Sequence, residues 1–265
     1  MKVPTAIIAA CVIFIVCIVT IGNGMAESQK PTAEAHVTVL NKYVWRGYEL
    51  SKDSLIIQPS LAIAYKGFGI NLWSNLDTAF DDKNPATSDE SSLNETDLTL
   101  SYGTEFGIFS LGAGYIYYSL DGMSDSREVY FSAGVDTLFS PTMIIYREVA
   151  HTPAWYINFG ISHSLELPRS IFLNLSASAG YYYSDDGSFV EIDNSLTPTA
   201  DEYRAFHDGL LTASLDIPVG EYVTVSPNIS YSFPLTGKSD NLISSSSYNG
   251  DSDFFYGGIT LSFAF

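Results

Sequence analysis

The C-terminal segment of the chain constrains the fold more than any other. In residues 253–265 the two faces alternate residue by residue, Phe255, Gly257, Ile259, Leu261, Phe263 and Phe265 on one and Phe254, Tyr256, Gly258, Thr260, Ser262 and Ala264 on the other. Alternation with period 2 predicts a β-strand with two different faces. A strand of this length exceeds those of most globular sheets and suits a tilted crossing of a bilayer.

Segments with the same periodicity recur throughout the chain, whereas a helical period is absent after the N-terminal region. With the last segment they make twelve predicted strands, at residues 35–47, 54–65, 68–78, 96–104, 107–119, 127–138, 142–150, 154–166, 170–183, 205–217, 221–233 and 253–265. Small polar side chains such as Asn174, Ser176 and Ser178 share one face, as a water-contacting barrel interior requires. We therefore predict an all-β fold, a single antiparallel transmembrane β-barrel of about twelve strands.

The connections between these segments support a barrel with two different ends. Links after even-numbered strands are short: Lys66-Gly67, Glu105-Phe106, Phe139-Ser140-Pro141, Leu167-Pro168-Arg169 and Pro218-Val219-Gly220. Links after odd-numbered strands are mostly longer and rich in Ser, Asp, Asn and Gly. This order is typical of periplasmic turns and external loops, although a soluble β-sandwich or lipocalin-like barrel is the alternative. Asn41 on an apolar face and the uneven segment 142–150 predict a bulge or a shifted boundary.

The N-terminal region has the pattern of a signal peptide. Lys2 supplies a positive charge, residues 7–21 are almost wholly apolar, and small residues around 24–26 offer a cleavage point. We expect residues 1–26 to be removed and residues 27–265 to form the barrel; the alternative is an uncleaved anchor helix. Both cysteines, Cys11 and Cys17, lie in the leader, so the mature chain would contain no thiol.

Charge and histidine placement exclude several functions. The formal net charge is −18, and removing residues 1–26, which contain one lysine and no acid, gives −18 − 1 = −19. Such a chain is a poor partner for nucleic acid, which requires clustered bases. His36, His151, His163 and His207 are scattered outside any nucleophile motif, so we expect no enzyme, and neither a cofactor nor a metal site. His163, between two serines, is the best candidate for the alternative of a barrel phospholipase.

Residues 41–77 contain an aromatic run, Tyr43-Val44-Trp45-Arg46-Gly47, at the end of the first predicted strand. This segment resembles the opening strands of the TorF-like porins. The resemblance implies a small-solute porin in a bacterial outer membrane. The end of the chain, Leu261, Phe263 and Phe265, is similar to the C-terminal strand that barrel-insertion machinery recognises, which implies that machinery as a partner.

Strand parity predicts which side chains line the barrel interior. The candidates are Lys42, Arg46, Trp73, Asn75, Asp77, Glu128, Tyr130, Asp136, Asp208 and Asp216. Ionised groups of this kind are costly beside lipid and tolerated in a wet lumen. Opposed bases and acids would create a transverse field that screens solutes. Alternatively, they pair into internal salt bridges and plug a structural barrel. Both hypotheses remain open at this point.

The predicted external loops carry 17 acids and four bases. A negative mouth raises the local cation concentration, so we expect passive diffusion of small hydrophilic solutes with a preference for cations or neutral solutes. The alternative is a structural or adhesive barrel whose acidic loops bind an external partner or bridge lipopolysaccharide through divalent cations. In both cases outer-membrane lipid and lipopolysaccharide would surround the chain.

Overall fold

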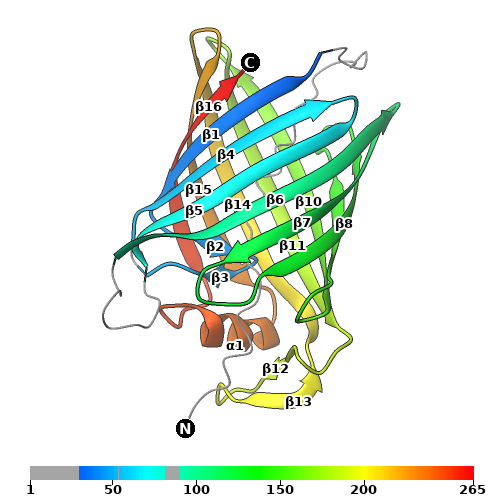
Figure 1. Cartoon of the computed structure of the whole chain (residues 1–265), viewed down its shortest axis with the longest axis vertical. Helices are drawn as coiled ribbons and strands as arrows, with labels where there is room; N and C mark the ends of the chain where they lie inside the picture. The colour runs from blue at the N-terminus through cyan, green and yellow to red at the C-terminus, as the bar shows by residue number, and fades with distance from the viewer. Residues whose placement is uncertain (1–29, 53, 81–89) are drawn as a thin grey trace.

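A computed structural model describes residues 30–52, 54–80 and 90–265, and in it twelve antiparallel strands form one closed barrel (Figure 1). The barrel strands are β1 (Thr32–Leu40), β4 (Ile56–Tyr65), β5 (Phe68–Phe80), β6 (Glu90–Phe106), β7 (Phe109–Leu120), β8 (Ser126–Val135), β9 (Thr142–Glu148), β10 (Ala154–Leu167), β11 (Ile171–Ser184), β14 (Arg204–Val219), β15 (Val223–Pro234) and β16 (Phe254–Ala264). The predicted fold class is confirmed. The expected signal peptide, residues 1–26 with both cysteines, lies outside the described residues.

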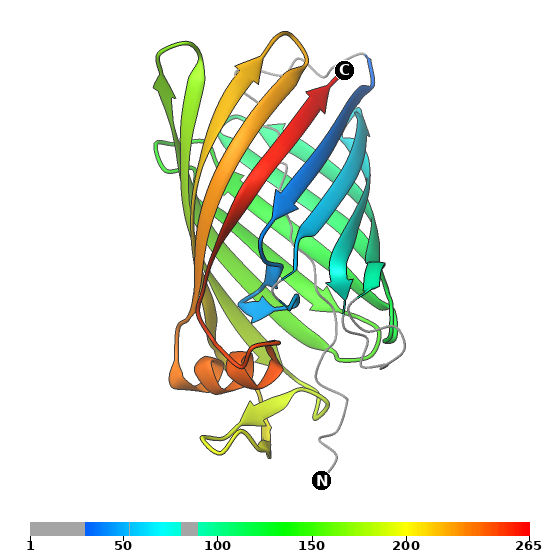
Figure 2. The same ribbon diagram turned by 90° about the vertical axis from the view of Figure 1, so that its left-hand side faces the viewer.

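The barrel closes where its first and last strands meet. β1 pairs with β16 in a register that includes Val37↔Leu261 and with β4 on its other side. The short turns and the C-terminus lie at one end of the barrel, and the longer connections lie at the other, which we call the loop end (Figures 1 and 2). Three predicted turns are shifted along the chain. Glu105 and Phe106 belong to β6, and the turn falls at residues 107–108, where Gly107 has a φ of 62°. Leu167 belongs to β10, and Pro218 and Val219 belong to β14, so these turns fall at residues 168–170 and 220–222.

The outer face of the barrel is apolar over neighbouring strands. Leu61 of β4 pairs with Leu72 of β5, which pairs with Leu98 of β6, and all three side chains are exposed. Ile63 and Ile70 continue the same band. A soluble protein rarely exposes a continuous apolar surface, whereas a membrane barrel presents one to lipid. Inward residues of the same strands toward the loop end, such as Gln58, Trp73 and Asp97, are buried. The alternation of the sequence therefore separates two environments.

Most predicted strands differ from the structure at one or both ends, and two of them differ at the irregular positions of the sequence. The first ends at Leu40, not at residue 47, and the Asn41 carboxamide oxygen accepts a hydrogen bond from the Gly257 amide (2.8 Å) at the strand end. β9 ends at Glu148 and alternates normally, with Ile144, Tyr146 and Glu148 buried. The irregular positions in the sequence therefore mark strand ends.

Four shorter strands and a helix lie toward the loop end. β2 (Val44–Trp45) and β3 (Tyr48–Glu49) form a small hairpin, and β12 (Val190–Ile192) and β13 (Pro198–Glu202) form another. Helix α1 (Gly237–Ser246) lies across the same end (Figure 2) and begins with a capping box formed by Thr236 and Ser239. Across the described ranges, every helix is too short or too polar to span a bilayer.

Candidate functional site: a hairpin in the barrel interior

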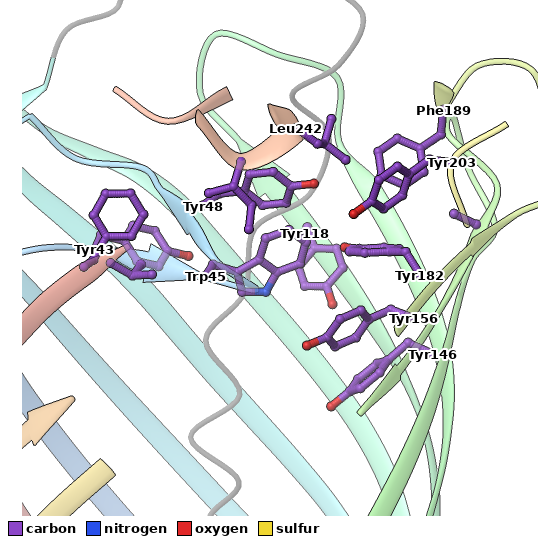
Figure 3. Packing of buried hydrophobic residues seen from close by; sticks show 14 of the residues in the cluster. Tyr43, Trp45, Tyr48, Tyr118, Tyr146, Tyr156, Tyr182, Phe189, Tyr203 and Leu242 are labelled. Carbon is purple, nitrogen blue, oxygen red and sulfur yellow. The ribbon is translucent and has the colours of Figure 1, made fainter. Parts of the chain in front are cut away.

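The segment between β1 and β4 folds into the barrel and places an arginine in its interior. Trp45 and Tyr48 pair across a two-residue turn whose central residues, Arg46 and Gly47, have φ angles of 42° and 87°. Positive φ at both positions is the geometry of a type I′ hairpin, in which glycine is favoured at the second. We call residues 41–51 the inner hairpin. Its Tyr43, Trp45 and Tyr48 are buried in the interior cluster of Figure 3.

Arg46 at the hairpin tip binds an acidic side chain of the barrel wall. Its Nη1 and Nη2 atoms donate to the two carboxylate oxygens of Glu128, each at 2.8 Å. The two side chains are only 8% and 3% exposed. The Glu128 carboxylate also accepts a hydrogen bond from the Tyr118 hydroxyl at 2.7 Å. A bidentate, desolvated pair of this kind fixes both distance and orientation.

Aromatic rings surround the guanidinium group. Its central carbon lies 4.1 Å from the ring centroid of Tyr156, 4.4 Å from that of Trp45 and 4.7 Å from that of Tyr146. Tyr182 follows at 5.9 Å. Arginine favours such sites because its planar guanidinium is weakly hydrated and stacks on aromatic faces. Figure 3 shows Tyr146, Tyr156 and Tyr182 in succession along one side of the interior.

A second set of contacts holds the base of the inner hairpin. The Tyr43 hydroxyl donates to Glu95 of β6 at 2.8 Å, and Lys42 pairs with Glu49 within the hairpin. Glu49 is fully buried and also accepts hydrogen bonds from the backbone and side-chain nitrogens of Asn249, both at 3.2 Å. The hairpin is thus attached both to the barrel wall and to the segment after α1.

Helix α1 closes over the hairpin tip. Leu242 and Ile243 are fully buried, and a Cβ atom placed on Gly47 would lie 2.8 Å from the Cδ1 atom of Ile243. The Glu49 carbonyl accepts a hydrogen bond from the Tyr248 amide at 3.2 Å. The inner hairpin and α1 together fill the interior at the loop end.

Two acidic side chains beside this hairpin have unsatisfied oxygens. Asp97 is 2% exposed, and within the described ranges neither of its carboxylate oxygens has a hydrogen-bond partner. The same holds for one oxygen of Glu95, two residues earlier on β6. A carboxylate that is buried without a partner is costly, and a bound proton or a bound cation relieves that cost.

The structure places most of the predicted interior residues on the inner face of the barrel. Trp73, Asn75, Asp77, Glu128, Tyr130 and Asp208 are buried. Asp208 accepts a hydrogen bond from Tyr156 at 3.0 Å, and the half-buried Asp216 accepts from Ser226 at 2.7 Å and from Asn174 at 2.8 Å. Glu128 and Arg46 meet directly, whereas Asp216 lies far along β14 from that pair.

Three of the predicted positions require correction. Lys42 and Arg46 reach the interior on the inner hairpin, because the chain leaves the barrel wall after Leu40. Asp136 follows the end of β8 and is exposed in a turn, where its amide donates to the Ile108 carbonyl at 2.7 Å. It therefore lies outside the strand on which it was predicted.

Sequence reasoning missed the aromatic residues that surround Arg46. Tyr118, Tyr146, Tyr156 and Tyr182 all occupy inward positions of predicted strands, so parity could have identified them. A strand that begins at residue 96 would leave Glu95 in an external loop, but β6 begins at Glu90. The contact of these residues with Arg46 depends on the inner hairpin, which is a tertiary feature.

The rim of the loop end carries exposed ion pairs. Arg147 pairs with Asp185 at 2.7 Å, and the hydrogen bond from Arg147 lowers the pKa of that carboxyl. The Tyr117 hydroxyl donates to Asp125 and likewise lowers the pKa of Asp125. Both acids therefore remain ionised at neutral pH. In the part of the chain that the structure describes, His, Cys, Asp and Glu side chains form no group of three or more suited to a metal ion.

Solved bacterial outer-membrane barrels are similar to this chain in structure. The NanC porin is 8% identical, with a TM-score of 0.50 and coverage of 89% of this chain and 99% of that one. OmpF from Salmonella typhi is 9% identical, with coverage of 89% and 97% and a TM-score of 0.40. The translocator domain of the autotransporter NalP from Neisseria meningitidis is 10% identical, with coverage of 92% and 90% and a TM-score of 0.40. No family model and no curated protein matches the sequence. The chain has a porin-like β-barrel fold.

Proposed function

We propose that the chain is a non-enzymatic channel of the bacterial outer membrane through which small hydrophilic solutes diffuse passively, cations and neutral solutes in preference to anions. Export through a cleaved signal peptide and contact with lipopolysaccharide belong to the same proposal. It is supported by the apolar outer face, by the porin-like fold and by the resemblance of residues 41–77 to TorF-like porins.

The charge balance of the barrel interior carries the proposal. The buried charged residues of the described ranges are seven acids, Glu49, Asp77, Glu95, Asp97, Glu128, Glu148 and Asp208. Two half-buried bases of the inner hairpin, Lys42 and Arg46, are already paired with two of these acids, Glu49 and Glu128. The excess is negative, and a low-dielectric wall strengthens its field inside the lumen. A cation entering the barrel would lower this electrostatic cost, and an anion would raise it.

A second candidate function is a structural or adhesive barrel whose loops bind an external partner. The observation that favours it is the filling of the loop end by the inner hairpin and α1, held by the buried Arg46–Glu128 pair. Channel and closed barrel differ in whether the hairpin leaves a path for solutes.

Conductance across a planar bilayer tests the proposed function. In a salt gradient we expect stable unitary steps with a reversal potential displaced toward that of the cation. The variant Glu95→Gln/Asp97→Asn, which removes two interior carboxyl groups without a basic partner, should move the reversal potential toward zero. Asp216→Asn is the control, because this acid lies far from the inner hairpin and has partners for both oxygens. The absence of unitary current steps after demonstrated insertion, or a reversal potential displaced toward that of the anion, would contradict the proposal.

A further inference from the structure

The groups that bind Arg46 belong almost entirely to the barrel wall. Glu128 lies on β8, Tyr146 on β9, Tyr156 on β10 and Tyr182 on β11. These four strands are consecutive neighbours in the sheet. The guanidinium they bind comes from a different segment, the inner hairpin between β1 and β4. The wall thus presents a receptor, and the hairpin supplies its ligand.

Contacts that do not involve Arg46 hold this receptor in place. The Tyr118 hydroxyl donates to Glu128, and the Tyr156 hydroxyl donates to Asp208. The rings of Tyr146 and Tyr156 lie 6.1 Å apart, and those of Tyr156 and Tyr182 lie 4.8 Å apart. A binding site whose side chains are already ordered loses little entropy when a ligand arrives.

The chemistry of the receptor selects one class of cation. Two carboxylate oxygens side by side match the fork of N–H donors on a guanidinium, and the ring faces match its flat surface. A primary ammonium group is compact and strongly hydrated, so it would use the charge but neither the fork nor the stacking. The receptor therefore distinguishes two cations of equal charge.

We propose that Glu128, Tyr146, Tyr156 and Tyr182 form a binding site for small solutes that carry a guanidinium group, and that Arg46 occupies this site as an internal competitor. Transport of such solutes rests on the proposed channel function, whereas their binding to this site does not. A guanidinium solute that enters the lumen would displace Arg46 and with it the tip of the inner hairpin.

The test uses the full folded barrel in detergent and the variant Arg46→Gly. Glycine suits the φ of 42° at this position, so the turn is kept while the side chain is removed. Isothermal titration with methylguanidinium should give saturable binding to Arg46→Gly, at least about tenfold tighter than that of methylammonium, since one bidentate, stacked contact contributes more than 1.4 kcal/mol. Wild type should bind the same probe more weakly because Arg46 competes.

Two further variants make the result specific. Arg46→Gly/Glu128→Gln should lose the binding, because the carboxylate is removed. Arg147→Gly is the matched control: Arg147 also pairs with an acid and lies 5.1 Å from the Trp155 ring, but its ion pair is exposed at the rim. Absence of saturable binding to a folded Arg46→Gly barrel, equal affinity for methylammonium, or binding unaffected by Glu128→Gln would each overturn the proposal. Failure of the channel function would appear as absent conductance and would leave these titrations unchanged.

Discussion

Glu128→Gln is expected to make the peptide bond after Arg46 accessible to trypsin in the folded barrel. The substitution keeps the shape of the side chain but leaves a buried guanidinium without its carboxylate. Removal of one partner from a buried ion pair costs about 3 kcal/mol or more. Because each 1.4 kcal/mol is a factor of ten, the open form of the inner hairpin should become about 100-fold more populated. Cleavage follows that population when opening is fast relative to proteolysis.

The measurement is the rate of cleavage between Arg46 and Gly47, followed by mass spectrometry under conditions in which the barrel stays folded. Asp216→Asn is the control for the loss of an interior carboxylate, since Asp216 is bound by Asn174 and Ser226 and does not contact the inner hairpin. If trypsin cleaved wild type and Glu128→Gln after Arg46 at the same rate, the ion pair would not be what holds the hairpin in the interior.

Removal of residues 42–51 is expected to produce the largest change in conductance. Leu40 and Ile56 are paired across neighbouring strands, so Asn41 and residues 52–55 would still connect β1 to β4 as a five-residue loop. A twelve-stranded barrel has a backbone radius of roughly 12 Å, which leaves a water-filled path once the obstruction is gone. We expect the unitary conductance to rise about fivefold or more.

Folding of the shortened barrel must be established first, by its heat-dependent mobility on a denaturing gel. A milder variant, Tyr43→Phe, removes the hydroxyl that donates to Glu95 and should leave the conductance close to that of wild type. If the shortened barrel inserts and conducts no better than wild type, the inner hairpin is not what limits the path.

The barrel was predictable because the sequence of each strand alternates between lipid-facing and interior-facing residues. Alternating residues in β16 and β11 separate an apolar from a small polar face without reference to any other segment, and the turns follow from short links between such strands. Parity then identified Glu128 and Asp208 as interior residues. These are local properties, and a single sequence contains them.

The inner hairpin was not predicted because its sequence also fits a strand. Residues 43–45 are aromatic or β-branched and continue the first strand in composition. Two local signals pointed to its end: Asn41 on the apolar face, which bonds to Gly257, and Arg46-Gly47, which forms a type I′ turn. The pairing of Arg46 with Glu128 joins residues 82 apart and depends on barrel closure, so no local pattern determines it.

A designed disulfide between the inner hairpin and the barrel wall tests the central claim most directly. A Cβ atom on Gly47 would lie 3.1 Å from the Cβ atom of Asp208, close to the separation of about 3.5–4.5 Å in disulfides, and residues 27–265 contain no cysteine. Thiol titration and gel mobility of Gly47→Cys/Asp208→Cys, beside each single variant, measure the crosslink. The single variant Gly47→Cys shows whether the turn tolerates a Cβ atom at a φ of 87° and beside Ile243. We predict that mild oxidation of the folded double variant joins the two thiols almost completely and that reduction frees them. Two free thiols after oxidation of a folded barrel would contradict the placement of residues 41–51 in the barrel interior.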